Sequence, residues 1–306
     1  MRSKQLNLGT YDTDKIRLGY LDVYDRILVS WLDKEIKLLE LGVYQGRSLE
    51  LWRDYFHRAT IVGIDLELPD GFVPGERIKL FRGSQADTRF LSEVADKTAP
   101  NGFDIIIDDA SHIGQLTRTA FWHLFDNHLK RGGLYAIEDW GTGYLDDFPD
   151  GKKFEPKPST LDPFPCHSHG MVGFVKELVD EQGAATIAMG CKAGCRLSKF
   201  QNLLITPGIV FVSKATPTIT AYPNPVPIGS DLANTRISWS TIDPTAKVFV
   251  SIDGCSESLL ATSCRGSTMA NWIRRGHTYE FRLYDSAHQE LLAKVVVTTA
   301  VGTDNR

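Results

Sequence analysis

The stretch FDIIIDDASH, residues 103–112, decides the fold that we expect for this chain. It contains a short apolar run, Ile105–Ile107, that ends in two carboxylates, Asp108 and Asp109, with His112 three residues further on. An apolar run of this length, bounded by polar residues, is typical of a strand that is buried on both faces of a parallel sheet. The stretch therefore predicts an α/β domain with acidic side chains at the carboxyl end of a strand.

A second acidic pair follows the same pattern. After an amphipathic segment, the sequence KRGGLYAIEDW (130–140) holds a glycine turn, a short apolar run, and then Glu138 and Asp139. Ligands of parallel sheets bind at the carboxyl ends of the strands, so both pairs are expected to face one crevice. Carboxylates with a histidine and no cysteine form a hard, oxygen-rich site that suits Mg²⁺. Acids in such positions also cap helices or solvate turns, but two pairs in one α/β unit favour a site.

A glycine turn precedes this unit. In IKLLELGVYQGRSLELW (36–52) an apolar run leads into Gly42 and Gly46, and a helix is predicted to begin at Ser48. Glycines let the backbone turn sharply and approach a ligand, and a helix N-terminus offers free N–H groups to a polar moiety. The spacing matches neither the dinucleotide fingerprint nor a phosphate loop, so this turn is a weak signal alone.

Polar side chains also follow the next two predicted strands. The predicted strand Thr60–Ile64 is followed by Asp65. An acid at this position either accepts hydrogen bonds from ribose hydroxyls or only stabilises a turn. Ile78–Arg82 leads into Ser84 and Gln85, which either meet an adenine edge or belong to the cap of the next helix.

Taken in order, ELGVYQGRS, GIDLE, GSQAD, DIIIDDASH and GGLYAIEDW resemble the motifs of class I S-adenosylmethionine (SAM)-dependent methyltransferases. More narrowly, they resemble the metal-dependent sugar O-methyltransferases of the macrocin and mycinamicin type, a pattern that cephalosporin hydroxylase-like proteins share. The resemblance covers about residues 8–213. It implies a Rossmann-like sheet with flanking helices, SAM and Mg²⁺ or a similar cation as cofactors, and methylation of a hydroxyl on a sugar or glycosylated small molecule.

The resemblance also implies roles for individual residues. Asp109, Glu138 and Asp139 correspond to metal ligands, and His112 corresponds to the base that removes the hydroxyl proton, so Asp109 and His112 are the expected catalytic pair. Glu40 is expected to face the methionine end of SAM, and Asp65 its ribose. The residues expected to bind the cofactor are Glu40, Gly42, Gly46, Ser48, Asp65, Ser84, Gln85 and Asp108.

Other groups are weaker candidates for the crevice. Thr13–Lys15, Tyr20 and Tyr24 lie in a lead-in helix region, where plain surface positions are the simpler interpretation. The segment Gly141–His169 is expected to shape the acceptor pocket, because aromatic faces suit sugar rings. Its aromatic and histidine residues are Tyr144, Phe148, Phe154, Phe164, His167 and His169. Beyond it, Met171–Asp180 reads as a helix, and Thr186–Met189 and Gly208–Val212 read as the last two strands of the domain.

At Lys214 the pattern changes to short alternating strands without a helical period. Such a pattern predicts a seven-strand β-sandwich resembling a fibronectin type III or immunoglobulin-like module, with Trp239 as core tryptophan and Tyr279 at a tyrosine corner. We therefore expect a methyltransferase domain at residues 1–213 and a β-sandwich at 214–306. Spacing, glycan contact and oligomer contact all stay open as roles of the sandwich.

Composition excludes some classes of partner. The 306 residues carry a net charge of −4 with no basic run, which disfavours nucleic acid. No signal peptide or membrane span is expected from the sequence. Five cysteines without a zinc spacing favour isolated thiols in a reducing cytoplasm, with Cys255 and Cys264 as the alternative pair. Whether the chain forms a homo-oligomer stays open.

Two rival functions remain. A hydroxylase on the same scaffold would need a redox metal and ordinarily two histidines with one carboxylate, so His167 would have to join His112. Alternatively, the sandwich recognises glycans and the α/β domain is a vestigial methyltransferase. The intact acids and histidine favour the methyltransferase.

Overall fold

The computed structural model describes residues 1–155, 167–192, 194–227 and 232–300, so the predicted pocket residue Phe164 lies outside the described residues. The chain divides into two compact units, Met1–Asp180 with Phe200–Lys214, and Glu181–Lys199 with Ala215–Arg306. The predicted boundary after residue 213 assigns residues 181–199 to the first domain instead. Independent folding of the two predicted domains stays a prediction.

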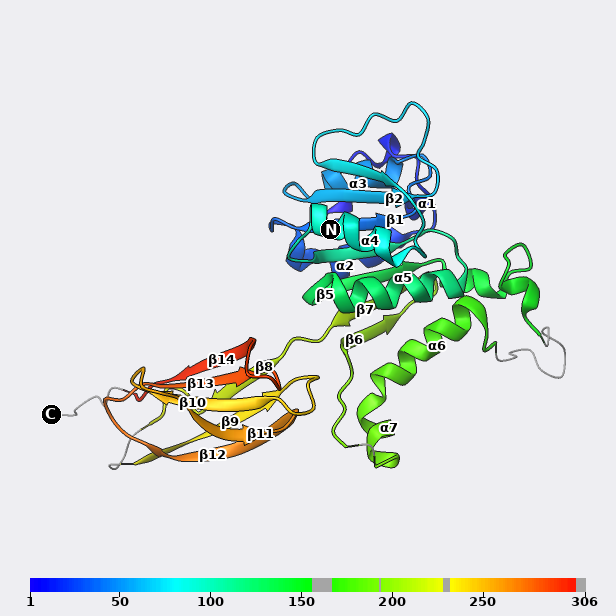
Figure 1. Cartoon of the computed structure of the whole chain (residues 1–306). Helices are drawn as coiled ribbons and strands as arrows, with labels where there is room; N and C mark the ends of the chain where they lie inside the picture. Colours follow the sequence, from blue (N-terminus) through cyan, green and yellow to red (C-terminus); the bar gives the residue numbers. More distant parts are fainter. Residues whose placement is uncertain (156–166, 193, 228–231, 301–306) are drawn as a thin grey trace. The chain divides into compact units, whose positions relative to one another are not determined.

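The first unit is built on a seven-stranded sheet in the order β3-β2-β1-β4-β5-β7-β6 (Figure 1). The five strands β1 to β5 run parallel, β7 is antiparallel to β5, and β6 is antiparallel to β7. The strands are β1 (Lys37–Leu41), β2 (Thr60–Asp65), β3 (Ile78–Arg82), β4 (Phe103–Asp108), β5 (Leu129–Glu138), β6 (Phe200–Ile205) and β7 (Ile209–Lys214).

Helices cover both faces of this sheet, because its strands are apolar on both sides. Ile106 packs into the core on the face of α4, α5 and α6, whereas Ile105 and Ile107 pack on the face of α2 and α3. The helices are α1 (Asp14–Arg17), α2 (Tyr20–Ile27), α3 (Arg47–Tyr55), α4 (Thr88–Thr98), α5 (Gly114–Asn127) and α6 (Gly170–Gln182). Short 3-10 helices are η1 (Ser3–Gln5), η2 (Leu8–Thr10), η3 (Val29–Trp31), η4 (Trp140–Tyr144) and η5 (Gly151–Lys153). This arrangement confirms the predicted Rossmann-like α/β fold.

Across the described residues, none of the helices combines the length and the hydrophobicity that a membrane crossing requires.

One predicted strand is wrong. Residues Thr186–Met189 belong to a helix, α7 (Ala184–Gly190), and the strand that pairs with β7 is β6. Periodicity cannot separate a strand from a short helix in a run of four residues, and the alanines at positions 184, 185 and 188 favour the helix. Strand β6 lies at the edge of its sheet and exposes Gln201 and Asn202, so its sequence lacks the continuous apolar run of the inner strands.

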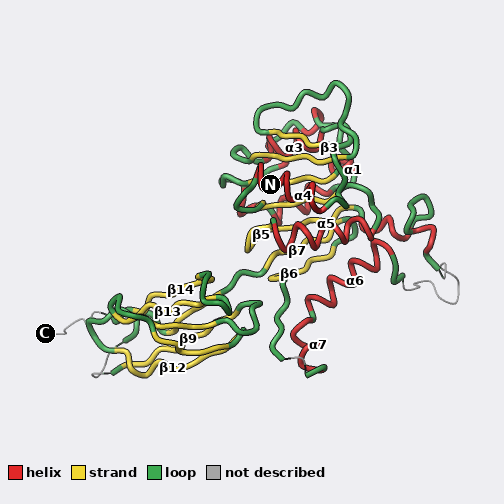
Figure 2. The backbone as a smooth tube through the Cα atoms, in the orientation of Figure 1, coloured by secondary structure: helices red, strands yellow, loops and turns green. Residues whose placement is uncertain are grey.

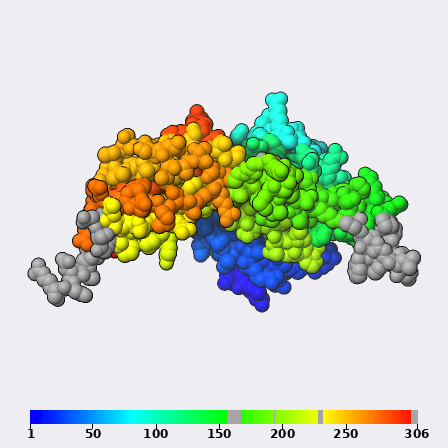
Figure 3. Space-filling model, turned by 90° about the horizontal axis from the view of Figure 1, so that it is seen from below, coloured from blue at the N-terminus to red at the C-terminus, as the bar shows by residue number. Residues whose placement is uncertain are grey.

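The second unit contains two antiparallel sheets, β11-β10-β13-β14 and β12-β9-β8, which share one hydrophobic core. Strands and loops alternate here, and the described residues of this segment contain no helix after Ala215 (Figure 2). The surface of this segment is coloured mainly yellow to red in the space-filling view (Figure 3). The strands are β8 (Thr218–Tyr222), β9 (Ala233–Ser240), β10 (Lys247–Ile252), β11 (Ser258–Thr262), β12 (Arg265–Ile273), β13 (Tyr279–Tyr284) and β14 (Leu291–Val297). The predicted β-sandwich is confirmed.

The prediction of isolated thiols is wrong for two cysteines. Cys195 and Cys264 form a disulfide, while Cys191 and Cys255 are free and exposed. The alternative pair, Cys255 with Cys264, is therefore also wrong. Cys195 and Cys264 are separated by 69 positions in the sequence, and only the fold decides which distant cysteines meet.

Candidate functional site

The acidic residues that end the parallel strands gather at one edge of the sheet. Asp65, Asp108 and Glu138 are the last residues of β2, β4 and β5. Strands β1 and β4 lie side by side although β2 and β3 come between them in the sequence, so the strand order reverses between β1 and β4. A reversal of this kind opens a crevice at the carboxyl ends of the strands, where open α/β sheets bind ligands.

A cavity of about 1030 Å³ occupies this edge. The predicted site residues that line it are Gly42, Ser48, Asp65, Ser84, Gln85, Asp109 and His112. Five others do not line it: Glu40, Gly46, Asp108, Glu138 and Asp139. Sequence reasoning missed Asp12, Arg17 and the stretch Leu66–Asp70, which also form the wall. Leu66 and Glu67 belong to the GIDLE motif but were not singled out, and the other residues lie outside the quoted motifs.

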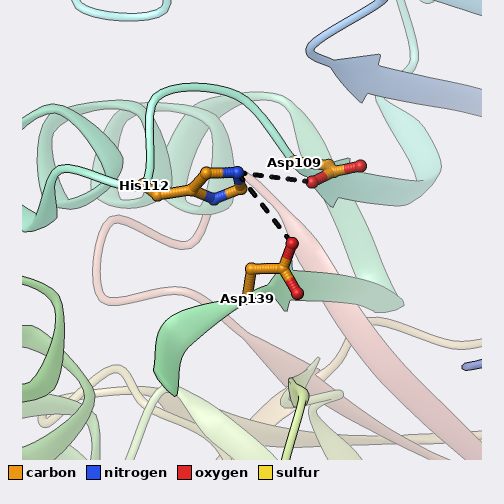
Figure 4. Close-up of side chains that lie close together, drawn as sticks. All are labelled: Asp109, His112 and Asp139. Atoms are coloured by element: carbon orange, nitrogen blue, oxygen red, sulfur yellow. Dashed lines mark ion pairs between the residues drawn. The ribbon is translucent and has the colours of Figure 1, made fainter. Parts of the chain in front are cut away.

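Asp109, His112 and Asp139 come together beside the cavity and are the group of described residues that could hold a metal ion. One ligand atom from each lies within 4.8 Å of the others. The imidazole of His112 points toward both carboxylates, with its Nε2 atom 3.9 Å from Asp109 Oδ1 and 3.9 Å from Asp139 Oδ2 (Figure 4). Two carboxylate oxygens and one imidazole nitrogen suit Mg²⁺ or Mn²⁺ better than a thiophilic metal.

The backbone at two members of this cluster is left-handed. His112 has φ 53° and Asp139 has φ 54°, a region that costs non-glycine residues free energy and that concentrates at functional sites. Phe148 packs edge-on against the His112 ring, with centroids 5.9 Å apart, and so restricts the imidazole. The surrounding structure thus determines where the His112 ring points.

Asp150 fixes the helix that begins just after His112. Its buried carboxylate accepts hydrogen bonds from the amides of Gly114 (2.7 Å) and Met171 (2.9 Å), at the N-termini of α5 and α6. One carboxylate therefore serves the free N–H groups of two helices and interacts favourably with both helix dipoles. The sequence gives no signal for this double cap, because the two amides are 57 positions apart.

Lys15 is the main site residue that sequence reasoning placed wrongly. It is completely buried rather than on the surface, and its ammonium lies 2.5 Å from Asp109, 2.8 Å from Glu138 and 3.3 Å from Glu40. Burial lowers the pKa of Lys15, but the three carboxylates outweigh this effect and raise it well above its usual value. Burial also raises the pKa of Glu138, to about 8, and that of Glu40. Lys15 is thus the counter-charge of the three carboxylates Glu40, Asp109 and Glu138.

The two predicted cofactor carboxylates that do not line the cavity lie behind its wall. Glu40 accepts hydrogen bonds from Ser48 Oγ (2.9 Å) and Trp52 Nε1 (3.3 Å). Asp108 accepts from Gln85 Nε2 (3.3 Å) and Tyr135 (3.1 Å), and burial raises its pKa to about 7. Both carboxylates therefore support residues of the wall rather than form it.

The fold requires a glycine at position 42, whether or not a ligand is bound. With φ 92°, it brings the turn so close to the next loop that a Cβ atom would lie 2.0 Å from the carbonyl oxygen of Asp109. The sequence interpretation, that this glycine lets the backbone approach a ligand, is therefore incomplete. The glycine therefore also allows the turn at residues 42–46 to pack against the loop that carries Asp109.

The aromatic residues expected to shape an acceptor pocket pack largely on each other. Phe154 lies 5.3 Å from Tyr144 and 4.8 Å from His167 between ring centroids, and His169 also contacts His167. Among the described residues, His167 takes no part in the metal-binding group of Asp109, His112 and Asp139. The pair of histidines that a hydroxylase would need is therefore not brought together.

No protein-family model matches the chain. Curated relatives do match part of it. The chain is 39% identical over 164 residues to demethylmacrocin O-methyltransferase of Streptomyces fradiae, covering 51% of this chain and 38% of the relative. It is 36% identical over 164 residues to mycinamicin VI 2''-O-methyltransferase of Micromonospora griseorubida, with the same coverages of 51% and 38%.

A solved structure agrees with these relatives. MycE methyltransferase of the mycinamycin biosynthetic pathway, in complex with Mg, SAH and mycinamycin VI, matches with 30% sequence identity and a TM-score of 0.50. The match covers 63% of this chain and 49% of MycE. The chain thus spans about half the length of MycE and less than half that of the curated relatives.

Proposed function

We propose that this chain is a SAM-dependent O-methyltransferase, assisted by a divalent cation, that acts on a hydroxyl of a sugar or glycosylated small molecule. The observation that carries the proposal is the position of Asp109 and His112 on the wall of the cavity. A metal-ligand candidate and a base candidate thereby face the space where a cofactor and an acceptor would meet. The partial likeness to sugar O-methyltransferases supports the same activity.

SAM would be held by the cavity wall. Asp65 lies at the end of β2, where an acid suits the ribose, and Ser84 with Gln85 follows β3, where polar groups suit the adenine. Gly42 and Ser48 border the start of α3, whose free amides suit a polar group. Glu40 and Asp108 would act from behind the wall by holding Ser48 and Gln85.

A divalent cation fits the donor set of this structure. Asp109 and Asp139 would hold the ion through carboxylate oxygens, which suit Mg²⁺, with His112 close beside them. Glu138, the third predicted carboxylate ligand, has both oxygens hydrogen-bonded within the protein. When bound, the cation would lower the pKa of a coordinated acceptor hydroxyl.

His112 is proposed as the base. Its Nε2 atom accepts the proton of the acceptor hydroxyl, and Phe148 keeps the imidazole turned toward the acidic pair. The deprotonated oxygen is then the nucleophile for the methyl group of the sulfonium, which becomes a thioether. Alignment of the two by the cavity wall supplies much of the rate enhancement.

We also propose that the second unit is a fibronectin type III-like module. The sheet orders β12-β9-β8 and β11-β10-β13-β14 support this, as does the buried indole of Trp239. The Tyr279 hydroxyl accepts a hydrogen bond from the amide of Arg274 (2.9 Å), as a tyrosine corner does. The role of this module and a homo-oligomer stay open, and a cytoplasmic location stays a prediction. Alkylation of the thiols in freshly lysed cells tests the location, because a reducing cytoplasm predicts a reduced Cys195–Cys264 pair.

Calorimetric titration with SAM and with S-adenosylhomocysteine (SAH), each with and without Mg²⁺, tests the proposed activity. Binding of both, followed by methyl transfer to a sugar-bearing acceptor in a screen, is the expected result. Absence of SAM binding would contradict the proposal. Turnover of an acceptor that requires Fe²⁺ and oxygen would favour the hydroxylase, and glycan binding without SAM binding would favour a vestigial domain.

A further inference from the structure

The N-terminal segment supplies three side chains that donate hydrogen bonds to the acids Asp109, Glu138 and Asp139. Lys15 lies on α1, and Tyr20 and Tyr24 lie on α2. Lys15 donates to Asp109 and Glu138, Tyr20 donates to Asp139, and Tyr24 donates to Glu138. These donors therefore come from more than eighty residues earlier in the sequence than the acids they bind.

The two aspartates of the cluster divide their oxygens in the same way. Asp109 uses Oδ2 for Lys15, at 2.5 Å, and directs Oδ1 toward His112. Asp139 uses Oδ1 for Tyr20 and directs Oδ2 toward His112. Each carboxylate thus has one oxygen fixed by the N-terminal segment and one oxygen turned into the site.

Glu138 differs from the aspartates. Its Oε1 accepts from the Tyr24 hydroxyl at 2.6 Å, and its Oε2 accepts from the Lys15 ammonium at 2.8 Å. Both oxygens are therefore engaged inside the protein, where only 1% of the residue is exposed. In this arrangement the N-terminal donors decide which carboxylate oxygens are offered to a cation.

We propose that Tyr20 and Lys15 are positioning residues that present Asp139 Oδ2 and Asp109 Oδ1 to a divalent cation, while Tyr24 and Lys15 hold Glu138 back. This inference rests on the cation site of the proposed function. Outer partners of metal ligands fix ligand orientation, and their loss costs about 10–100-fold in metal affinity.

Gly208 provides an independent way to disturb Tyr20. A Cβ atom at this position would lie 2.3 Å from Cε1 and 2.5 Å from the hydroxyl oxygen of Tyr20. The Gly208 carbonyl also accepts the amide of Asp139, at 2.8 Å. A methyl group here would displace the Tyr20 ring while leaving its hydroxyl on the chain, so Gly208→Ala tests the position of the hydroxyl rather than its presence.

The experiment measures Mn²⁺ affinity of the full chain by calorimetry and by electron paramagnetic resonance, with SAH present, and SAH affinity separately. Tyr20→Phe is expected to weaken Mn²⁺ binding about 10–100-fold and to leave SAH affinity unchanged. Gly208→Ala should also weaken Mn²⁺ binding. The double variant Tyr20→Phe/Gly208→Ala should bind Mn²⁺ no more weakly than the weaker-binding single variant. Tyr24→Phe should not weaken it, because Glu138 offers no oxygen to the cation.

Tyr11→Phe is the matched control. It removes a hydroxyl that donates to the carboxylate of Asp54, at 2.9 Å, and neither residue lines the cavity. Mn²⁺ affinity equal to wild type in Tyr20→Phe, or a loss of equal size in Tyr24→Phe, would overturn the inference while the methyltransferase proposal stands. A wild type that binds SAH but no Mn²⁺ would overturn the inference and the cation site, and one that binds neither would overturn the proposed function as well.

Discussion

The carboxylate of Asp65 closes the turn that contains Val43, with Oδ2 2.7 Å from the Val43 amide nitrogen. The same oxygen accepts from the amide of Tyr44 at 3.0 Å, and Tyr44 is left-handed with φ 48°. Asp65 therefore orders the glycine turn at the end of β1 before any ligand arrives. The residue expected to contact the ribose also shapes the turn beside it.

Asp65→Ala is expected to weaken SAM binding by roughly 1–3 kcal/mol, because charge-assisted hydrogen bonds are lost both to ribose and within the turn. Calorimetry on the purified variant measures this loss. Glu76→Ala, which changes an exposed acid outside the cavity wall, is the control and should bind SAM like wild type. Unchanged SAM affinity in Asp65→Ala, or binding of NAD in place of SAM by wild type, would refute the assignment.

His112→Ala is expected to lower turnover about 10²–10⁴-fold, because the hydroxyl loses its proton acceptor. SAM and metal affinity should be retained, and added Mg²⁺ should not restore the rate. Steady-state kinetics with an acceptor from the screen measures this, with the exposed residue His57 replaced by alanine as control. A fall in metal affinity of the same size would instead identify His112 as a metal ligand.

Asp139→Ala is expected to behave differently from His112→Ala. It removes one oxygen ligand and leaves a weaker site, so turnover should fall and then recover in part as Mg²⁺ is raised. Turnover of both variants against Mg²⁺ concentration separates the two roles. Full wild-type turnover in excess EDTA would show that no divalent cation takes part.

The parallel strands and most of the cavity wall could be predicted from the sequence, because each strand carries its own signal. Ile105–Ile107 is apolar on both sides, and the acids Asp108 and Asp109 follow at once. Placement of these acids at one edge then follows from the topology of parallel sheets.

What the sequence could not predict depends on contacts between distant residues. Lys15 reads as a surface residue until three carboxylates from distant parts of the chain surround it, and Asp150 reads as a loop acid until two helix N-termini meet it. Glu138 could be placed in the crevice but not oriented, since its partners Tyr24 and Lys15 belong to another segment.

Asp108→Asn tests the effect of burial on a carboxyl group. Burial raises the pKa of Asp108 to about 7 in the folded protein, whereas the pKa of an aspartate in an unfolded chain is about 3.9. The folded state therefore binds more protons between these values, and Asp108 makes the free energy of unfolding fall as pH rises from about 4 to about 7. The difference between Asp108→Asn and wild type in urea unfolding should grow in favour of the variant over this range. A difference that does not change with pH would contradict the buried, protonated state.

A fragment that ends at Lys214 is expected to fold and to bind SAM. The Lys214 ammonium donates to the carbonyls of Phe125 (2.5 Å) and Asp126 (3.0 Å) at the end of α5, and to that of Leu129 (2.8 Å) at the start of β5. A fragment 1–213 should therefore melt at a lower temperature than a fragment 1–214. Thermal unfolding and SAM calorimetry on both measure this, and a folded fragment that no longer binds SAM would show that the second unit contributes to the site.

The Cys195–Cys264 disulfide makes a covalent ring of the chain between these two residues. A protease that cuts the backbone once inside this ring therefore leaves a nicked molecule whose two pieces remain joined. On a denaturing gel the nicked protein would keep the mobility expected for 34.1 kDa material until a reductant separates the fragments. A single cut before Cys195 or after Cys264 would release its fragments without reductant, so the same gel locates the cut with respect to the ring.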